Sequence, residues 1–344
     1  MAVTIQDVAK AADVSVATVS RVVNNIPLVS ESTRQRVLQA IEELGYEPNE
    51  VARSLKVRKT NTIGIIIDDI TKQQFTMVCR GVTDACWLYG YNVFVANTDT
   101  DLEKEEHYLK MFLQKQCDGI LVVTRMLTDE LAEKLRALKV PVVLCTVVDP
   151  TGALSSVCID NYQSAYDAVA FMYEMGHRSV GFLNGNKENY TVCVEREKAM
   201  RDAAQKLGMT IKEEWLTQSS IEEEKKPYAQ VGYDRMGEVL ACSERPSVVL
   251  CINDEFAAGA IKRAEEEGLR VPDDISIMGY NNYWISEWTK PQITTVSQPR
   301  FDIGAVGARL LIKKIENKPY ELNAGDSIIV PHEIVVRETV KKLV

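Results

Sequence analysis

The sequence predicts an all-α helix-turn-helix head followed by an α/β body of two doubly wound parallel-sheet lobes. Residues 1–47 contain three short stretches of helical periodicity, whereas from Thr62 onward apolar strand-like runs alternate with amphipathic helical stretches. A chain of 344 residues with 46% hydrophobic content can bury several cores. We expect the head at 1–47, a short linking helix and linker at 48–60, and the body at 61–344.

The first helix of the head is predicted to begin after Thr4, which is a favourable N-cap residue. One face of this helix carries apolar residues at i, i+3, i+4 and i+7, namely Ile5, Val8, Ala9 and Ala12. A tight connection through residues 13–14 then leads to Ser15, which can cap a second helix. The two helices are therefore separated only by a turn.

The second helix is predicted to have one apolar and one polar face. Its inward stripe consists of Val19, Val22 and Val23. At 100° per residue the opposite side carries Ala17, Arg21 and Asn24, flanked by Thr18 and Ser20. This face is small and able to form hydrogen bonds, whereas a solvated helix usually carries Glu and Lys, so it is suited to a close approach to another surface.

A third helix is predicted from Ser32 to Leu44, with Gly45 as its stop signal. Its inward residues are Val37, Ala40, Ile41 and Leu44. Three helices around one small core, with a turn before the second, describe a helix-turn-helix domain whose second helix enters the DNA major groove. Hydroxyl and Asn side chains suit phosphate oxygens, and Arg21 suits the guanine edge. A protein-contact role for a three-helix head stays open at this point.

The charge distribution supports contact with a polyanion at the end of the head. The formal net charge is −9, yet residues 1–60 hold 8 basic against 7 acidic residues, which leaves 32 against 42 in the rest. Residues 51–60 carry four positive charges and no acid. There, Leu55 lies among basic residues including Arg53, a composition used to wedge open a minor-groove base step. The alternative is an ordinary solvated linker.

The body is predicted to contain two sets of βαβ units. The first set has the strand runs TIGIIID, YNVFVAN, DGILVVT and VPVVLCTVV, with helices at about 74–89, 103–115 and 128–138. The second set has SVGFLNG, SVVLCIND and SIMGYN, and glycines 90, 176, 208 and 268 mark helix ends in the two sets. Folds of this type bind ligands at the carboxyl ends of the strands.

The head resembles that of the LacI/GalR family of bacterial transcriptional regulators. The similarity is carried by TIQDVAKAADVSVATVSRVVNN and VSESTRQRVLQAIEELGYEPNEVARSL, with Asp13 standing where glycine is commonest. The resemblance implies a hinge helix with Leu55 as the intercalating residue. It implies base contacts by Val16, Ala17 and Arg21, phosphate contacts by Thr4, Ser15, Thr18, Ser20 and Asn24, and hinge-helix positions at Asn49, Ala52 and Leu55.

The resemblance also implies a periplasmic-binding-protein-like body whose chain crosses between the lobes three times. The crossings are expected near 159–162, 289–294 and 323. Lobe 1 would then comprise about 61–160 and 293–323, and lobe 2 about 162–290 and 325–340.

Polar residues at strand ends are candidates for an effector site between the lobes. The strand-end candidates are Asp68, Asp69, Asn97, Asp99, Asn253, Asp254, Asn281 and Asn282, and possible stacking rings are Phe75, Tyr190, Trp284 and Trp288. By the resemblance, Arg196 is the arginine that holds the effector, with Asn253 near it. The predicted effector set is Phe75, Asn97, Tyr190, Arg196, Asn253, Asn281 and Gln298.

Two departures from the family pattern fall in this candidate site. The stretch KQQF (72–75) stands where the family reads NPFF, and GYNN stands where it reads an Asp pair, so Asn281 replaces an acid. The expected effector is a sugar, a sugar derivative or an anionic molecule near Arg196.

Enzyme and metal functions find little support in the sequence. The sequence lacks GxGxxG, P-loop and GxSxG motifs. Of its three histidines, His177 is predicted to have a structural role. Its eight cysteines have no metal-ligand spacing, so we expect buried free thiols and neither metal nor cofactor. No apolar run is long enough to span a bilayer, and MAVTIQDVAK lacks the pattern of a signal peptide, so a cytoplasmic protein without membrane contact is expected.

We therefore expect a transcriptional regulator, and specifically a repressor, that binds a palindromic double-stranded DNA operator as a homodimer. A small polar effector is expected to control this binding. One alternative is a catabolite-control-type regulator governed by a phosphorylated carrier protein, a branch that QPRFDIGAVGARLL (298–311) resembles. Alternatives of another class are a doubly wound enzyme and a secreted solute-binding protein.

Overall fold

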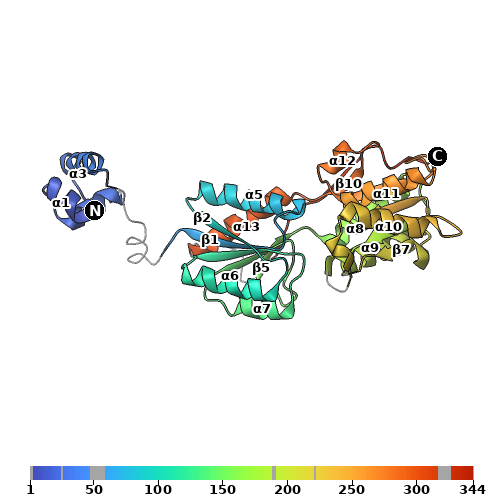
Figure 1. Ribbon diagram of the computed structural model, residues 1–344, viewed down its shortest axis with the longest axis horizontal. Helices are drawn as coiled ribbons and strands as arrows, with labels where there is room; N and C mark the ends of the chain where they lie inside the picture. The colour runs from blue at the N-terminus through green and yellow to red at the C-terminus, as the bar shows by residue number, and fades with distance from the viewer. Residues whose placement is uncertain are drawn as a thin grey trace. The chain divides into compact units, whose positions relative to one another are not determined.

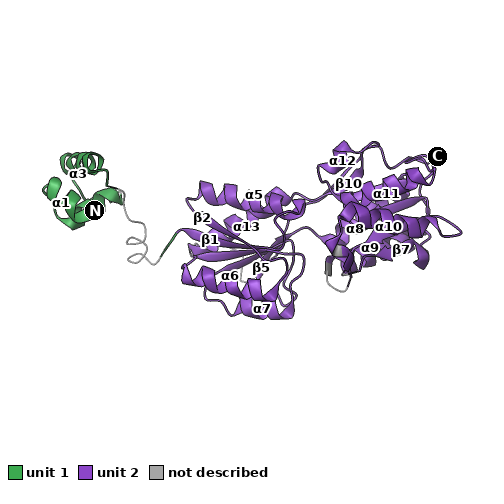
Figure 2. Cartoon of the chain, viewed as in Figure 1, with its two compact units in different colours: residues 1–60 green, residues 61–344 purple. Residues whose placement is uncertain are grey.

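The computed structural model describes residues 3–24, 26–46, 59–187, 191–220, 222–316 and 327–343. The chain divides into two compact units, Met1–Thr60 and Asn61–Val344 (Figures 1 and 2). We describe each unit by itself. Among the described residues, no helix is long and apolar enough to cross a membrane.

The first unit contains the three predicted helices, α1 (Ile5–Ala11), α2 (Val16–Val23) and α3 (Glu31–Leu44). Thr4 forms a capping box with Asp7, and Ser15 caps α2 by accepting a hydrogen bond from the Thr18 N–H. Helix α3 begins one residue earlier than expected, because Ser30 caps it by accepting from the Thr33 N–H. Gly45 ends α3 in the left-handed conformation, with φ 62°.

The core of the head is small and apolar. Val8, Val19 and Val37, one from each helix, are completely buried against one another. Leu44, predicted to face inward, is instead 36% exposed at the last turn of α3. Asp13 lies in the turn between α1 and α2 with φ 50°, a conformation that glycine adopts freely and Asp tolerates better than most residues.

Lobe 1 of the second unit is built on a six-stranded parallel sheet in the order β11-β5-β4-β3-β1-β2. Its strands are β1 (Thr62–Ile67), β2 (Asn92–Asn97), β3 (Gly119–Val123), β4 (Val142–Cys145), β5 (Ser155–Cys158) and β11 (Ser327–Ile329). Its helices are α5 (Gln73–Leu88), α6 (Leu102–Gln114), α7 (Asp129–Arg136) and α13 (Arg300–Ile315). Helices α5 and α13 lie on one face of the sheet, and α6 and α7 lie on the other (Figure 1).

Lobe 2 is built on a second six-stranded sheet in the order β12-β10-β9-β8-β6-β7, with only β12 antiparallel to its neighbour. Its strands are β6 (Val180–Asn184), β7 (Leu216–Gln218), β8 (Val248–Cys251), β9 (Ser276–Asn281), β10 (Thr294–Ser297) and β12 (Glu333–Val335). Its α-helices are α8 (Asn161–Glu174), α9 (Thr191–Leu207), α10 (Tyr228–Leu240), α11 (Asp254–Glu266) and α12 (Ile285–Trp288), and it also has the 3-10 turns Glu213–Trp215 and Glu222–Lys225.

Two of the three crossings between the lobes lie later in the chain than expected. Strand β10 belongs to the sheet of lobe 2, so the second crossing lies at residues 298–299 and not at 289–294. Strand β11 belongs to the sheet of lobe 1, so the third crossing lies at 330–332 and not near 323. Strands β10 and β11 have only four and three residues, and neither was among the strand runs predicted for the two lobes.

Glycine pairs bring helices into close contact on each lobe. A Cβ on Gly81 of α5 would lie 2.0 Å from the Phe301 carbonyl oxygen of α13, and one on Gly304 would lie 2.0 Å from the Val78 carbonyl oxygen. Helices α10 and α11 pack as closely through Gly232 and Gly259. These contacts fix the beginnings of the four helices, each of which carries residues of the pocket described below.

The cysteines and His177 have the structural character that the sequence predicts. All eight cysteines are free thiols, six of them buried. His177 is buried, its Nδ1 lies 3.0 Å from Ser247 Oγ, and its Nε2 lies 3.2 Å from the Lys341 carbonyl oxygen.

Candidate nucleic-acid interface and ligand pocket

Helix α2 presents the polar face that its sequence predicts. Val16, Ala17 and Arg21 are exposed, whereas Val19 and Val22 are buried in the head. Thr18 and Ser20 are half-buried at the edges of this face. The exposed surface of α2 thus combines two small apolar side chains with one guanidinium group, which can donate two parallel hydrogen bonds.

Several residues predicted to contact phosphate also cap helices. Ser15 Oγ accepts from the Thr18 N–H at 3.2 Å and lies 2.9 Å from Thr18 Oγ1. Asn24 Nδ2 donates to the Ser20 carbonyl oxygen at 2.7 Å at the end of α2. Thr4 is exposed and caps α1. These side chains therefore have a local structural role whether or not DNA is bound.

Some predicted site residues lie outside the described residues. These are Asn49, Ala52, Arg53 and Leu55 of the predicted hinge helix, and Tyr190 of the predicted effector site.

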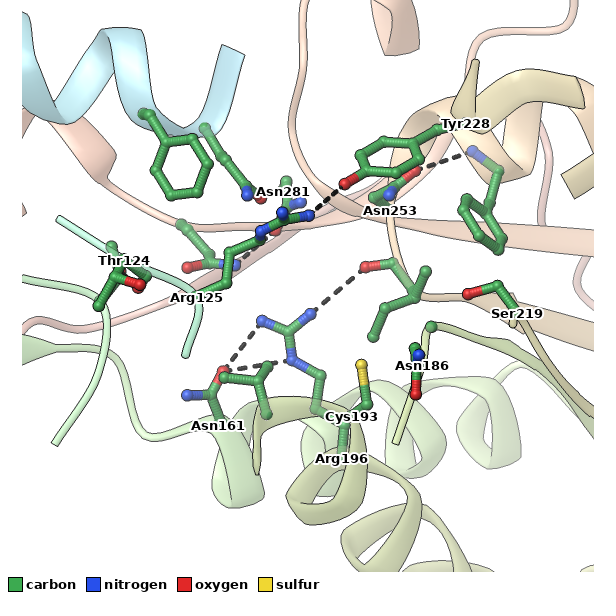
Figure 3. A pocket seen from close by; sticks show the side chains of 18 of the residues that line it. Thr124, Arg125, Asn161, Asn186, Cys193, Arg196, Ser219, Tyr228, Asn253 and Asn281 are labelled. Atoms are coloured by element: carbon green, nitrogen blue, oxygen red, sulfur yellow. Dashed lines mark hydrogen bonds between the residues drawn. The ribbon is translucent and has the colours of Figure 1, made fainter. Parts of the chain in front are cut away.

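A pocket lies between the two lobes of the second unit, at the carboxyl ends of their strands (Figure 3). Its empty space is about 870 Å³, a volume that includes space open to solvent. It is lined by Gln74, Phe75, Thr124, Arg125, Thr146, Asn161, Gly185, Asn186, Val192, Cys193, Arg196, Ser219, Tyr228, Ile252, Asn253, Phe256, Asn281, Gln298 and Arg300.

The structure brings together most of the predicted effector residues. Phe75, Arg196, Asn253, Asn281 and Gln298 all line the pocket. Amides and hydroxyls alternate there with aromatic rings, an arrangement able to bind a hydroxylated ligand by hydrogen bonds on its edge and by ring contact on its face.

Asn97 and the two exposed tryptophans do not line the pocket. Asn97 Oδ1 accepts from the Ile70 N–H at 2.7 Å and its Nδ2 donates to Asp99 at 2.7 Å, so the side chain holds the β1–α5 loop. Trp284 and Trp288 are 63% and 80% exposed and lie outside the pocket lining. Including Asn97 in the predicted effector set was therefore wrong.

Arg196 is buried in the floor of the pocket and is held by uncharged groups. Its Nε and Nη2 donate to Asn161 Oδ1 at 3.2 and 2.9 Å, and its Nη1 donates to the Ile252 carbonyl oxygen at 3.3 Å. The guanidinium carbon lies 3.7 Å from the centre of the Tyr280 ring, in cation–π geometry. The side chain is thus fixed in place with part of its donor capacity unused.

Asn281 is the last residue of β9, and it has a positive φ angle together with Asn282, which follows it. Their φ angles are 95° and 51°, which asparagine and aspartate tolerate better than most residues. Asn281 Nδ2 donates to the Tyr283 hydroxyl at 2.8 Å, its Oδ1 accepts from Gln298 Nε2, and its carbonyl oxygen accepts from Arg300. The amide is thus part of a hydrogen-bonded network that includes both the lobe 2 loop and the crossing segment.

Sequence reasoning missed Arg125 and Tyr228. Arg125 Nη1 donates to the Tyr228 hydroxyl at 2.6 Å, which joins lobe 1 to lobe 2 across the pocket. A signal was available for Arg125, because it follows the strand run DGILVVT and so lies at a carboxyl strand end. Tyr228 begins α10 after a stretch with no strand pattern, and nothing in its sequence context points to the pocket.

Two buried carboxylates lie behind the lining. Asp68 accepts from the Arg125 N–H at 2.8 Å, its Oδ2 lies 3.6 Å from Arg125 Nε, and burial raises its pKa. Asp254 accepts from the Tyr283 N–H at 2.6 Å, and burial raises its pKa to about 7. Both acids therefore organise the loops of the pocket.

The described lining of the pocket carries amides, hydroxyls, aromatic rings and guanidinium groups. No histidine, aspartate or glutamate occurs among its described lining residues. No group of His, Cys, Asp and Glu in the described part of the chain has the geometry of a metal site.

Two family models match separate parts of the chain, one in the first structural unit and one within the second. Residues 4–49 match the family described as bacterial regulatory proteins, lacI family. Residues 169–340 match the periplasmic binding protein-like domain.

The chain is similar along its whole length to characterised proteins. It is 38% identical to the HTH-type transcriptional regulator RegA of Clostridium saccharobutylicum over 98% of this chain and 99% of that one. It is 38% identical to catabolite control protein A of Priestia megaterium over 99% and 100% of the two chains. Among solved structures, the lac repressor dimer bound to operator and the anti-inducer ONPF matches with a TM-score of 0.86 and 25% identity, over 99% of this chain and 100% of that one.

Proposed function

The chain belongs to the lacI family of bacterial regulatory proteins, and from this premise we propose that it binds a palindromic operator as a homodimer and represses transcription under the control of an effector bound in the pocket between its lobes. The protein is a transcriptional regulator with a DNA-binding head and an effector-binding body. The observation that carries the proposal is the joint presence of the exposed face of α2 and the pocket in one chain.

The exposed face of α2 supports major-groove binding. Val16 and Ala17 are small enough to let the helix approach base edges, and Arg21 can donate to the O6 and N7 atoms of guanine. Ser15, Thr18, Ser20, Asn24 and Thr4 would then donate to phosphates, and the predicted hinge residues would contact the minor groove. Such a regulator acts in the cytoplasm, where bacterial DNA lies.

Exposed apolar side chains of lobe 1 support a dimer. Trp87 and Leu88, at the end of α5, are 82% and 81% exposed, and Phe94 and Val95 are exposed on β2, the last strand of its sheet. A monomeric protein rarely exposes this many large apolar side chains to solvent. A twofold dimer would also read two half-sites, as a palindromic operator requires.

The lining of the pocket supports a small polar effector rather than a reaction. Its amides and hydroxyls can both donate and accept hydrogen bonds, and Phe75, Tyr228 and Phe256 offer rings to the face of a sugar-like molecule. We assign effector contacts to Phe75, Arg196, Asn253, Asn281 and Gln298.

An operator selected from a random DNA library would test the DNA-binding part of the proposal. Fluorescence anisotropy against this operator, repeated over a range of salt concentrations, should give a steep negative dependence of log K on log salt. Arg21→Ala should reduce discrimination at one base pair of each half-site by about 1–3 kcal/mol. Arg270→Ala, which removes the same charge from an exposed site in the body, is the matched control. Equal base preference in both variants would refute the role of Arg21.

A second candidate is control by a phosphorylated carrier protein. It is favoured by residues 298–311, which comprise the crossing segment and most of α13 and leave Phe301 and Arg309 exposed, and by the full-length similarity to catabolite control protein A. Calorimetric titration with the phosphorylated and unphosphorylated forms of a carrier protein would distinguish this candidate from control by a small molecule alone.

A further inference from the structure

The charges that line the described part of the pocket between the lobes are all of one sign. Arg125, Arg196 and Arg300 line it, and its described lining residues include no acid. A guanidinium group stays protonated at every physiological pH. The pocket therefore keeps its positive charge under all conditions in which the protein works.

Arg196 is buried without a charged partner. It is 5% exposed, and its partners among the described residues are an amide oxygen, a carbonyl oxygen and an aromatic ring. It uses three of its five N–H groups in these contacts. A buried cation among neutral acceptors is costly in free energy, and an anionic ligand would remove that cost.

The unsatisfied polar atoms of the lining are donors. Arg300 is 7% exposed and donates to the carbonyl oxygens of Asn281 and Asn282, but its Nε has no partner in the described part of the chain. Gln74 Nε2 is buried and is also without an acceptor among the described residues. These unsatisfied donors favour a ligand that carries many hydrogen-bond acceptor atoms.

The nearby carboxylates do not cancel this charge. Asp68 contacts Arg125 from behind the lining, and Asp254 accepts from the Tyr283 N–H, so neither carboxylate faces the pocket. At position 281, where the family pattern has an acid, an uncharged amide stands. Asp68 beside Arg125, Asp254 near Arg300 and Glu195 near Arg196 all lie outside the pocket lining, so the charged groups that line the described pocket are the guanidinium groups.

Six helices also begin at the pocket. Residues from the first turns of α5, α8, α9, α10, α11 and α13 line it, namely Gln74, Phe75, Asn161, Val192, Cys193, Tyr228, Phe256 and Arg300. The N-terminal end of a helix carries a partial positive charge and favours anions. The N-terminal ends of these helices and the arginine side chains therefore both favour the binding of an anion.

We propose that the effector is an anionic molecule whose phosphate or carboxylate group lies between the guanidinium groups of Arg125 and Arg196, with its hydroxylated part bound by the amides of the lining. Figure 3 shows both arginines pointing into the same space. This inference rests on the proposed effector role of the pocket and names the chemical class of the effector.

Thermal unfolding of the full chain tests the inference without knowledge of the whole effector. Inorganic phosphate should raise the melting temperature above that in chloride of equal ionic strength, since a ligand that binds only the folded state stabilises it. Calorimetry with glucose, glucose 6-phosphate and gluconate, and with ribose and ribose 5-phosphate, then compares matched molecules. At least one anionic member should bind tenfold or more tightly than its neutral sugar.

Two variants assign the binding to the pocket. Arg125→Gln removes a charge, and Asn281→Asp adds an opposite charge in a backbone conformation that aspartate also tolerates. Each should weaken phosphate binding at least tenfold, whereas Arg270→Gln, at an exposed guanidinium elsewhere on lobe 2, should leave it unchanged.

Three results would overturn the inference: no stabilisation by phosphate, equal stabilisation of the native chain and Arg125→Gln, or equal affinity for neutral and anionic sugars. Titration of the chain with operator DNA in the absence of ligand tests the proposed function separately from this inference. A chain that binds its operator but shows no preference for anions refutes this inference alone, and a chain that fails to bind DNA specifically refutes the proposed function.

Discussion

The Nη1 atom of Arg125 in lobe 1 lies 2.6 Å from the hydroxyl oxygen of Tyr228 in lobe 2. Two further contacts join the lobes beside it. The Tyr283 hydroxyl donates to Gln74 Oε1 at 3.1 Å, and Lys72 Nζ lies 4.2 Å from the centre of the Tyr228 ring. The side chains that would meet an effector thus also connect the lobes, so that a ligand in the pocket acts directly on the contacts between them.

Removing both partners of the Arg125–Tyr228 hydrogen bond should lower the free energy of unfolding by less than the sum of the losses in the two single variants. We expect Arg125→Gln and Tyr228→Phe to be coupled by about 1 kcal/mol, because the bond has a charged donor but Arg125 is partly exposed. Urea unfolding of the four proteins of the double-mutant cycle measures this coupling. Strictly additive effects would contradict a direct bond between the lobes.

Ser15 should have two separable roles. Ser15→Ala removes the N-cap of α2 and should destabilise the head by about 1 kcal/mol. Ser15→Asp keeps a good cap and a favourable charge at the helix N-terminus, but its carboxylate repels DNA phosphate. We expect Ser15→Asp to keep the native melting temperature of the head and to weaken operator binding at least tenfold. Unimpaired DNA binding by Ser15→Asp would show that Ser15 serves only as a cap.

The head could be predicted from sequence because each of its signals is local. The caps Thr4 and Ser15 and the stop at Gly45 precede or follow clear helical periodicity, and the structure confirms them. The beginning of α3 was predicted one residue too late, because the Thr33 N–H donates to Ser30 Oγ and this cap places the first helical residue at Glu31.

The pocket could be predicted only in part because its geometry depends on tertiary contacts. Asn253 and Asn281 follow long apolar strands, and the strand-end rule places them correctly at the pocket. Asn97 satisfies the same rule, yet its side chain bonds to the Ile70 N–H of its own loop. Whether a strand-end amide faces the ligand or its loop depends on the loop conformation, which the residue pattern does not contain.

The packing of α10 on α11 predicts a large effect of a single methyl group. In Gly259→Ala the new Cβ would lie 1.8 Å from the Ala229 carbonyl oxygen, so the helices must separate. We expect a loss of about 1–3 kcal/mol in the free energy of unfolding. Ligand binding should also weaken, since Tyr228 and Phe256 lie in the first turns of these helices and line the pocket. Calorimetric unfolding measures the first effect.

Gly208 provides the control for this substitution. It has φ 69° and open space around its Cβ position, and asparagine tolerates that conformation. Gly208→Asn adds the strain of this backbone conformation but no steric clash, so it should cost less than Gly259→Ala. A similar loss in both variants would show that close helix packing is not the cause.

Asp254 should make the protein less stable as the pH rises from about 4 to 7. Burial raises its pKa to about 7, above its ordinary value of 3.8, so within this window the folded state binds more protons than the unfolded state. Ionisation of Asp254 therefore costs free energy only in the folded protein. Asp254→Asn can keep the hydrogen bond from the Tyr283 N–H without a charge, and should be more stable than the native chain at pH 8 by on the order of 1.4 kcal/mol per unit of raised pKa.

The stability of both proteins between pH 5 and 8, measured by urea unfolding, tests this prediction. Glu105 has the same sign, since burial raises its pKa to about 7, so part of the slope should persist in Asp254→Asn and become smaller when Glu105→Gln is added. Burial also raises the pKa of Asp68, Glu195 and Glu255, so a residual slope of the same sign should remain in the double variant. Carboxylates whose pKa is lowered, such as Asp149 beside Arg136, lose their contribution at lower pH and leave this window unaffected. An unchanged slope in Asp254→Asn would mean that Asp254 is already ionised in the folded protein, with its charge balanced by Arg300 and Arg337 nearby.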